Sequence, residues 1–279
     1  MRSRLLAFIA VALSLMTQPT SADDRRTREL VPTSEGQIDV ITEGRGPLIL
    51  LLPSRGRDSE DYDDVAEGLA HAGFRVLRPQ PRGIGKSTGP MQGLTLHDFA
   101  RDIATVIRHY GGSAVIVGHA YGNWVARMTA VDHPDLVRGV VIAAAAAKTY
   151  PPELSVAVTR SGDMTLPKEE RLKYLRGTFF ASGNDPSIWL DGWHPQASES
   201  QRLAGLATRQ EQWWSAGKVP LLDLQADNDP FHPIDKMNEL KDELGERVTV
   251  AVIPNASHAL LPEQPKAVVE AIAAWVRAL

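Results

Sequence analysis

The chain has 279 residues, of which 43% are hydrophobic and 23% are charged, and its formal net charge at pH 7 is −4. This length suffices for one sizeable core, and α/β domains of this size are usually single. The slightly acidic balance argues against nucleic acid or an anionic membrane as a partner, and the absence of cysteine excludes disulfides, thiolate metal sites and a cysteine nucleophile.

The N-terminal residues have the pattern of a secretory signal peptide. Two arginines precede an apolar run over residues 5–16, and small residues follow up to Ala22. We therefore expect a signal peptide over residues 1–22 and a mature chain, residues 23–279, that is exported to the periplasm or secreted. A membrane anchor is the alternative, but the run is short for a span of about 20 residues, and Pro19 closes it. We expect no stable membrane insertion after cleavage.

Apolar runs of strand length alternate with helical patterns along the rest of the chain. The continuous run over residues 48–52 is typical of a strand buried on both faces, and Thr95 and Asp98 are spaced like a capping box at the start of a helix. In chain order, the predicted strands cover residues 37–42, 48–52, 74–78, 114–118, 137–143, 219–224 and 248–253, and the predicted helices cover residues 59–71, 95–110, 123–133, 234–244 and 265–278.

This alternation predicts an α/β fold with a mostly parallel sheet and helices on both of its faces. It is interrupted from residue 148 to about residue 218, in a stretch that is helical in parts. We interpret this stretch as a short helical lid inserted over one edge of the sheet within a single domain. Its tryptophans either line an apolar lid or anchor the lid to the body; they are Trp189, Trp193, Trp213 and Trp214.

The predicted strand over residues 114–118 runs into Gly-His-Ala-Tyr-Gly and then into a helix. This is the strand–turn–helix context of the nucleophile elbow, G-x-S-x-G. Gly118 and Gly122 are expected to be structural, because side chains there would collide with the backbone of a strained turn. Ala120 stands at the central position, the nucleophile position, and its methyl group cannot attack a carbonyl. We expect His119 to pack beneath the sheet edge.

The motif resembles that of the α/β-hydrolase superfamily, and the resemblance covers nearly all of the mature chain. In that family the central residue is serine, or in some branches aspartate or cysteine. Residues 78–87 are similar to the family's D-x-R-G-x-G-x-S loop, which is structural. The agreement of several motifs in chain order makes the fold expectation firm, whereas Ala120 departs from the family pattern.

Two further loops carry the residues that the resemblance implies for catalysis. Residues 224–233 look like the family's acid loop, G-x-x-D-x-x-x-P, whose register implies Asp229 as the acid, with Asp227 as the second choice. Residues 254–265 resemble the loop that delivers the catalytic histidine, which is His258 here. The chain order of elbow, acid and histidine is the order that this fold uses.

The resemblance also implies an oxyanion hole made of two backbone N–H groups. One belongs to Tyr121, directly after the nucleophile position, and the other comes from the loop after residues 48–52. We expect Ser54 to supply it, since Pro53 has no N–H. The Oγ of Ser54 is a weaker candidate for a relocated nucleophile. Two arginines of this loop, Arg55 and Arg57, either bind an anionic substrate or are solvated loop charges.

An imidazole held by a carboxylate can take a proton near neutral pH from serine, from water or from a substrate. We therefore expect a hydrolase or related enzyme in which His258 and Asp229 act on a small, partly apolar molecule without a serine nucleophile. One alternative is a non-catalytic protein that binds a ligand in the retained pocket. Another is a serine ester hydrolase whose nucleophile has been replaced by alanine. Neither a cofactor nor a metal is expected, since the histidines lack metal-ligand spacing.

Overall fold

The computed structural model describes residues 26–279, so the predicted signal peptide lies outside the described residues. The strands form one sheet in the order β1-β2-β4-β3-β5-β6-β7-β8. Neighbouring strands from β4 to β8 pair in parallel, and β2 pairs antiparallel with β1 and with β4. The strands are β1 (Thr27–Pro32), β2 (Gln37–Gly44), β3 (Leu48–Leu52), β4 (Arg75–Pro79), β5 (Ala114–His119), β6 (Val137–Ala143), β7 (Leu221–Ala226) and β8 (Val248–Ile253).

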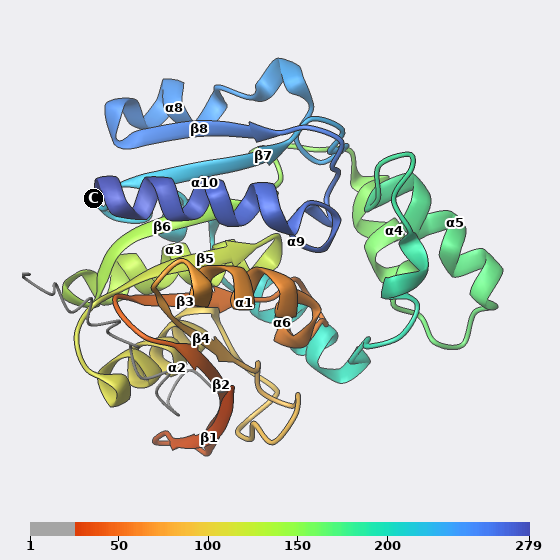
Figure 1. The fold of residues 1–279 in the computed structure, drawn as a ribbon. Coiled ribbons are helices and arrows are strands. Elements are labelled where there is room, and N and C mark those ends of the chain that lie inside the picture. The colour runs from red at the N-terminus through yellow and green to blue at the C-terminus, as the bar shows by residue number, and fades with distance from the viewer. Residues whose placement is uncertain (1–25) are drawn as a thin grey trace, which may run out of the picture.

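Helices cover both faces of this sheet (Figure 1). On one face, α1 (Asp63–His71) packs against α10 (Pro265–Ala278), and on the other α2 (Leu96–Tyr110) packs against α3 (Tyr121–Asp132). Alternate residues of β3 point into two different apolar cores. Leu50 packs in the core that contains residues of α2 and α3, and Leu51 packs in the core that contains residues of α1 and α10. The predicted α/β fold with a mostly parallel sheet is therefore confirmed.

The structure differs from the sequence predictions in three places. The helix predicted from Ser59 begins as a 3-10 turn, Ser59–Tyr62, because the side chain of Asp58 accepts from the N–H of Glu60 and tightens the chain there. The helix predicted over residues 234–244 is split into a 3-10 turn and the short helix α8 (Glu239–Leu244). Strand β1 was not predicted. Its side chains are exposed apart from Val31, so it lacks the apolar alternation that marks a half-buried strand.

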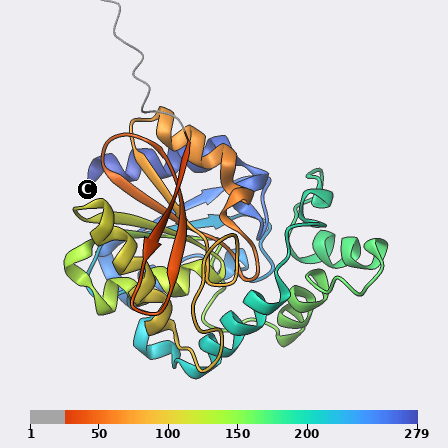
Figure 2. The same cartoon turned by 90° about the horizontal axis from the view of Figure 1, so that it is seen from below.

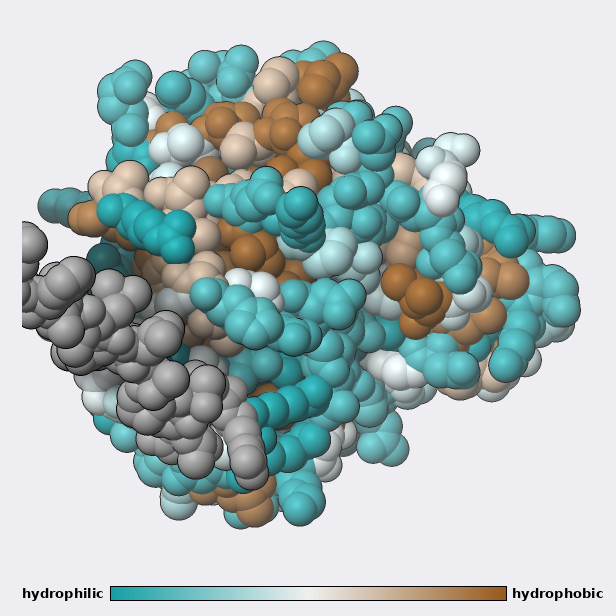
Figure 3. Space-filling view, in the orientation of Figure 1, coloured by the Kyte–Doolittle hydropathy of each residue, from teal (hydrophilic) through white to brown (hydrophobic). Residues whose placement is uncertain are grey.

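Between β6 and β7 the chain forms helices that stand beside the carboxyl ends of the strands (Figures 1 and 2). The space-filling view shows hydrophobic residues among the hydrophilic ones over α4 and α5 (Figure 3). None of the helices in residues 26–279 has the length and apolar character needed to cross a bilayer. The helices of this middle segment are α4 (Pro152–Ser161), α5 (Lys168–Thr178), α6 (Pro195–Ala207) and α7 (Gln210–Trp213); a further short helix, α9 (Leu260–Glu263), precedes α10.

The four tryptophans of the middle segment are buried in packing contacts. Trp189 and Trp193 lie in an apolar cluster with Phe179, and Trp213 and Trp214 lie in the core beside α3. All four are less than a tenth exposed. Their position fits the reading in which they anchor the segment to the body.

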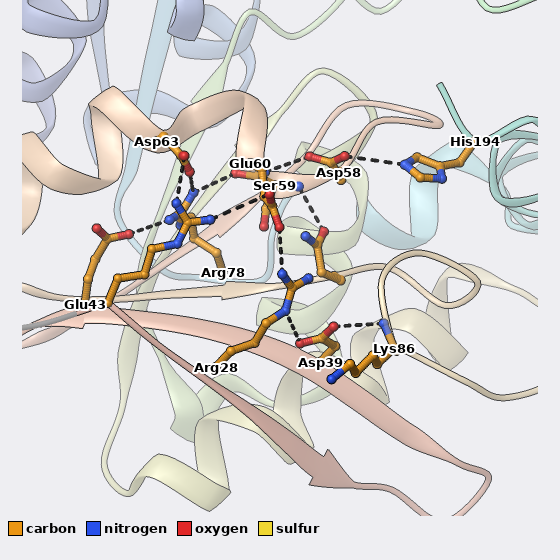
Figure 4. A network of polar contacts seen from close by, with 12 residues as sticks. Arg28, Asp39, Glu43, Asp58, Ser59, Glu60, Asp63, Arg78, Lys86 and His194 are labelled. Carbon is orange, nitrogen blue, oxygen red and sulfur yellow. Dashed lines mark hydrogen bonds and ion pairs between the residues drawn. The ribbon is translucent and has the colours of Figure 1, made fainter. Parts of the chain in front are cut away.

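A polar network ties the N-terminal strands to the start of α1 (Figure 4). The guanidinium of Arg78 is fully buried and pairs with Glu43 at 2.7 Å and also with Asp63. At its other end the network reaches the middle segment, where the Nε2 atom of His194 lies 3.4 Å from Asp58. These charges are satisfied by one another, so the network is a structural feature of the body.

Candidate active site

The turn between β5 and α3 holds Ala120 in a backbone conformation that is rare outside glycine, with φ 47° and ψ −115°. Such strain costs about 1–3 kcal/mol and persists only where the surroundings impose it. The flanking glycines have no room for a side chain. A Cβ at Gly118 would lie 2.5 Å from the backbone of Asn123, and one at Gly122 would lie 2.5 Å from the carbonyl oxygen of Leu52. The turn is therefore tightly packed around a methyl side chain.

The loop after β8 brings His258 to the loop after β7. The Nδ1 atom of His258 lies 2.9 Å from the Oδ2 atom of Asp229, and both side chains are buried. The other carboxylate oxygen of Asp229 accepts the N–H of Phe231 at 2.8 Å. Asp227, the second choice from the sequence, is exposed and bonds to Asn228 instead. The structure thus brings Asp229 to the histidine, and not Asp227.

The imidazole of His258 is also held by aromatic contacts. Its ring lies 4.1 Å from the ring of Phe231 and 5.5 Å from that of Phe179, measured between centroids. Because a carboxylate oxygen accepts at Nδ1, the neutral ring carries its proton there and presents a lone pair at Nε2. Among residues 26–279 no hydrogen-bond partner is found for this Nε2. The ring is therefore oriented as a base with one free nitrogen.

A chain of buried hydrogen bonds links the loop after β3 to the loop of His258. The N–H of Ser54 donates to the hydroxyl of Tyr62 at 3.1 Å, this hydroxyl lies 2.7 Å from Nδ1 of His119, and Nε2 of His119 lies 2.6 Å from the carbonyl oxygen of His258. A carbonyl can only accept, so His119 donates from Nε2 and accepts the Tyr62 hydroxyl at Nδ1. Every link then has one donor and one acceptor.

The ring of His119 is neutral at pH 7. It is fully buried at the carboxyl end of β5, and this burial, reinforced by the neighbouring His258, lowers its pKa from 6.5 to about 3. Burial likewise raises the pKa of the Tyr62 hydroxyl, so that group stays protonated. No sequence pattern predicted this role for Tyr62, since a single tyrosine near a helix start is compatible with many roles.

The hydrogen bond to Tyr62 contradicts one prediction, that the N–H of Ser54 is a free oxyanion donor. The next residue offers the alternative. The backbone N–H of Arg55 makes no hydrogen bond to the described residues, and Arg55 lines the same cavity as Tyr121. Tyr121 is the first residue of α3, and N–H groups at that position have no acceptor within the helix.

A cavity of about 560 Å³ adjoins both Ala120 and His258. Its walls come from the turn, from the loops after β3 and β6, and from α4 and α6 of the middle segment. None of the four tryptophans of that segment lines it. The apolar part of the lining consists of Trp124, Val156, Val158, Phe179, Leu206 and Phe231.

The two arginines of the loop after β3 lie in different surroundings. Arg57 is 1% exposed, donates to Asp61 at 2.6 and 2.7 Å, and lies over the rings of Trp189 and Trp193 at 5.0 and 4.9 Å from their centroids. It joins the middle segment to the body, so neither predicted role, substrate binding or a solvated charge, describes it. Arg55, in contrast, lines the cavity.

The chain is similar to a known protein family and to several curated proteins. The model of the alpha/beta hydrolase family matches residues 49–271. The chain is 26% identical over 233 residues to the pyrethroid hydrolase of Sphingobium wenxiniae, a match that covers 76% of this chain and 81% of the relative. It is 34% identical over 105 residues to the 2-(acetamidomethylene)succinate hydrolase of Mesorhizobium japonicum, and the chain spans only 37% of that relative's length.

Solved structures agree with the architecture. The bromoperoxidase of Bacillus anthracis has a TM-score of 0.74 at 18% identity, over 90% of this chain and 100% of the other. E-2-(acetamidomethylene)succinate hydrolase has a TM-score of 0.73 at 22% identity, over 91% of this chain and 100% of the other. At these identities the likeness is one of fold.

Proposed function

Because the chain belongs to the alpha/beta hydrolase family, we propose that it is a hydrolase that cleaves an ester-like bond in a small, partly apolar molecule without a covalent intermediate. In this proposal His258 is the general base and Asp229 orients it. One observation carries the proposal: Nδ1 of His258 is bonded to Asp229 at 2.9 Å, while its Nε2 is unengaged in a ring that lines a cavity shared with Ala120.

The proposed reaction uses water in place of a serine hydroxyl at the nucleophile position, where Ala120 stands. Nε2 of His258 takes a proton from this water as its oxygen bonds to the carbonyl carbon, and Asp229 stabilises the imidazolium that forms. The backbone N–H groups of Tyr121 and Arg55 donate to the developing oxyanion. His258 then returns the proton to the leaving oxygen as the ester bond breaks, which restores the neutral ring.

Two predictions from the sequence belong to the same proposal. The helices over residues 148–218 act as a cover over the cavity within a single domain that spans residues 23–279. The pattern of residues 1–22 supports export, so that the protein works in the periplasm or outside the cell on a small-molecule substrate. The hydrolases among its relatives support the reaction class, since their names state hydrolysis of a pyrethroid and of an acetamidomethylene succinate.

A second candidate function is ligand binding without catalysis. The observation that favours it is Ala120 itself, because loss of the nucleophile removes most of the rate of a serine hydrolase. A pure binder, however, has no need for a carboxylate-oriented imidazole with a free nitrogen. The third reading, a serine ester hydrolase whose serine has been replaced, shares the site but predicts no activity in the present chain.

The deciding experiment compares the wild-type protein with His258→Ala on a panel of esters, lactones and enolisable ketones. General-base catalysis contributes about 10²–10⁴-fold, so we expect the variant to lose at least about a hundredfold on any substrate that the wild type turns over. Equal rates of the two proteins on every compound would contradict an enzyme and favour the binder.

A second arm introduces Ala120→Ser and measures labelling by a fluorophosphonate. With an oriented base and two N–H donors in place, the new serine should become covalently labelled, and wild type should not. Labelling together with an inactive wild type would favour the replaced-nucleophile reading. An unlabelled but folded variant would show that the turn does not present a side chain to His258.

A further inference from the structure

Arg55 is a partly buried cation that forms no ion pair with any of residues 26–279. Its Nη2 atom donates to the hydroxyl of Thr159 at 3.2 Å, and its Nε atom is buried without any hydrogen-bond acceptor. No carboxylate of residues 26–279 forms an ion pair with it. Burial lowers the pKa of Arg55 and the charge of Arg202 acts in the same direction, whereas Tyr150 and Glu199 act in the opposite direction. A guanidinium in such surroundings gains when an anion arrives.

Tyr121, in the wall of the same cavity, has a second donor without an acceptor, its hydroxyl group. It is buried and has no hydrogen-bond partner among the described residues. Burial raises its pKa, with Arg55 acting in the opposite direction, so it remains an O–H donor at neutral pH. Tyr121 and Arg55 both line the cavity that adjoins Ala120 and His258. Each residue therefore has a donor without an acceptor, and both residues belong to the wall of the same cavity.

Three other arginines of this region have carboxylate partners and serve as a comparison for Arg55. Arg160 pairs with Glu170 at 3.1 Å and Arg202 pairs with Glu199 at 2.7 Å, and their side chains are 39% and 40% exposed. Arg57 is deeply buried but has a bidentate partner in Asp61. Arg55 alone among these four forms no ion pair with a carboxylate of residues 26–279, and its Nε atom is buried without an acceptor. A ligand can therefore supply the anionic acceptor that the guanidinium of Arg55 lacks.

We propose that Arg55 and the hydroxyl of Tyr121 bind a carboxylate of the substrate. This inference rests on the proposed function, since it places the carboxylate in the cavity where the bond is cleaved. A guanidinium donates two parallel N–H groups to the two oxygens of a carboxylate, and the neighbouring hydroxyl adds a third donor. The apolar wall then contacts the rest of the molecule. The substrate class is an ester that carries a free carboxylate on a small apolar body, such as a half-ester of a dicarboxylic acid.

The experiment measures binding, which is independent of turnover. Phenylacetate and phenylacetamide have the same apolar body and differ in charge, so calorimetric titration of both into the wild-type protein isolates the carboxylate. We expect phenylacetate to bind at least about tenfold more tightly than phenylacetamide. The preference should disappear in Arg55→Gln and persist in the matched control Arg202→Gln. Tyr121→Phe should reduce it several-fold. Inorganic phosphate serves as the competing anion and should bind more weakly than phenylacetate.

Three results would overturn the proposal: absence of phenylacetate binding, equal binding of acid and amide by the wild type, or an unchanged preference in folded Arg55→Gln. Tighter binding of phosphate than of phenylacetate would also overturn the assignment to a carboxylate. If Arg55→Gln does not fold, the wild-type comparison of acid and amide still decides. A different experiment tests the proposed function: if it is wrong, His258→Ala should have unchanged turnover. The same variant should keep its affinity for phenylacetate, so the two failures can be told apart.

Discussion

The turn around Ala120 and the outer side of α5 in the middle segment are packed in opposite ways. At the turn, a Cβ on Gly122 would meet backbone oxygen at 2.5 Å, and the buried ring of His119 has both nitrogens engaged. In the middle segment, a Cβ added at Gly177 of α5 would have no atom within 4 Å. The buried hydroxyl of Ser161 has no hydrogen-bond partner among the described residues. The turn has no room for an added atom, whereas the outer side of α5 has open space.

The largest effect expected from this contrast is that of Gly122→Ala. The added methyl would lie 2.5 Å from the carbonyl oxygen of Leu52 and 2.8 Å from that of Pro53, and neither backbone can move without shifting β3 or the turn. Overpacking of this kind costs about 1–3 kcal/mol and can cost more. We expect a loss at or above the upper end, measured as the free energy of unfolding in urea. A change below about 1 kcal/mol would mean that the turn is looser than described.

A second test of the rigid side uses pH and His119. The pKa of about 3 in the folded protein lies below the unfolded value of 6.5, so the unfolded chain binds the proton first as the pH falls. The stability that this neutral ring provides is therefore complete above pH 6.5 and decreases toward pH 3. Between pH 6.5 and pH 5 the loss should be about 2 kcal/mol.

Urea unfolding of the wild type and of His119→Asn at both pH values separates this contribution from those of other groups. The variant should show a shallower pH dependence. In the folded wild type, the ring protons observed by NMR should show no titration above pH 4. A midpoint near 6.5 would contradict the buried neutral ring.

The smallest effect, and one of opposite sign, is expected for Gly177→Ala in α5. The site is exposed, offers open space and lies within a helix, so alanine loses less backbone entropy than glycine on folding. The expected gain is up to about 0.5–1 kcal/mol in the free energy of unfolding. Destabilisation at this position would remove the contrast between the two regions.

The sequence allowed the fold and the placement of the main loops to be predicted, because their signals are local. Gly118 and Gly122 bracket a turn after a buried strand, and the proline spacing of the acid loop selected Asp229 over Asp227. Strand β1 was missed because pairing, and not an apolar pattern, defines it. The sequence predicts a feature well when the residues that determine it lie close together in the chain, and poorly when they do not.

The contacts of the loop after β3 could not be predicted in the same way. The backbone N–H of Ser54 donates to Tyr62, Arg55 lines the cavity, and the guanidinium of Arg57 lies over the rings of two tryptophans. Each destination is set by residues far away in the chain. The hydrogen-bond chain through His119 joins four segments, and no single one of them contains its pattern.

The strained backbone of Ala120 also has an evolutionary consequence. Alanine and serine codons of the GCN and UCN sets differ by one nucleotide, and the turn already holds the φ of 47° that a side chain at this position requires. The flanking glycines and the orientation of His258 would need no second change to accommodate a serine. A variant of this chain with serine at position 120 is thus one point mutation away.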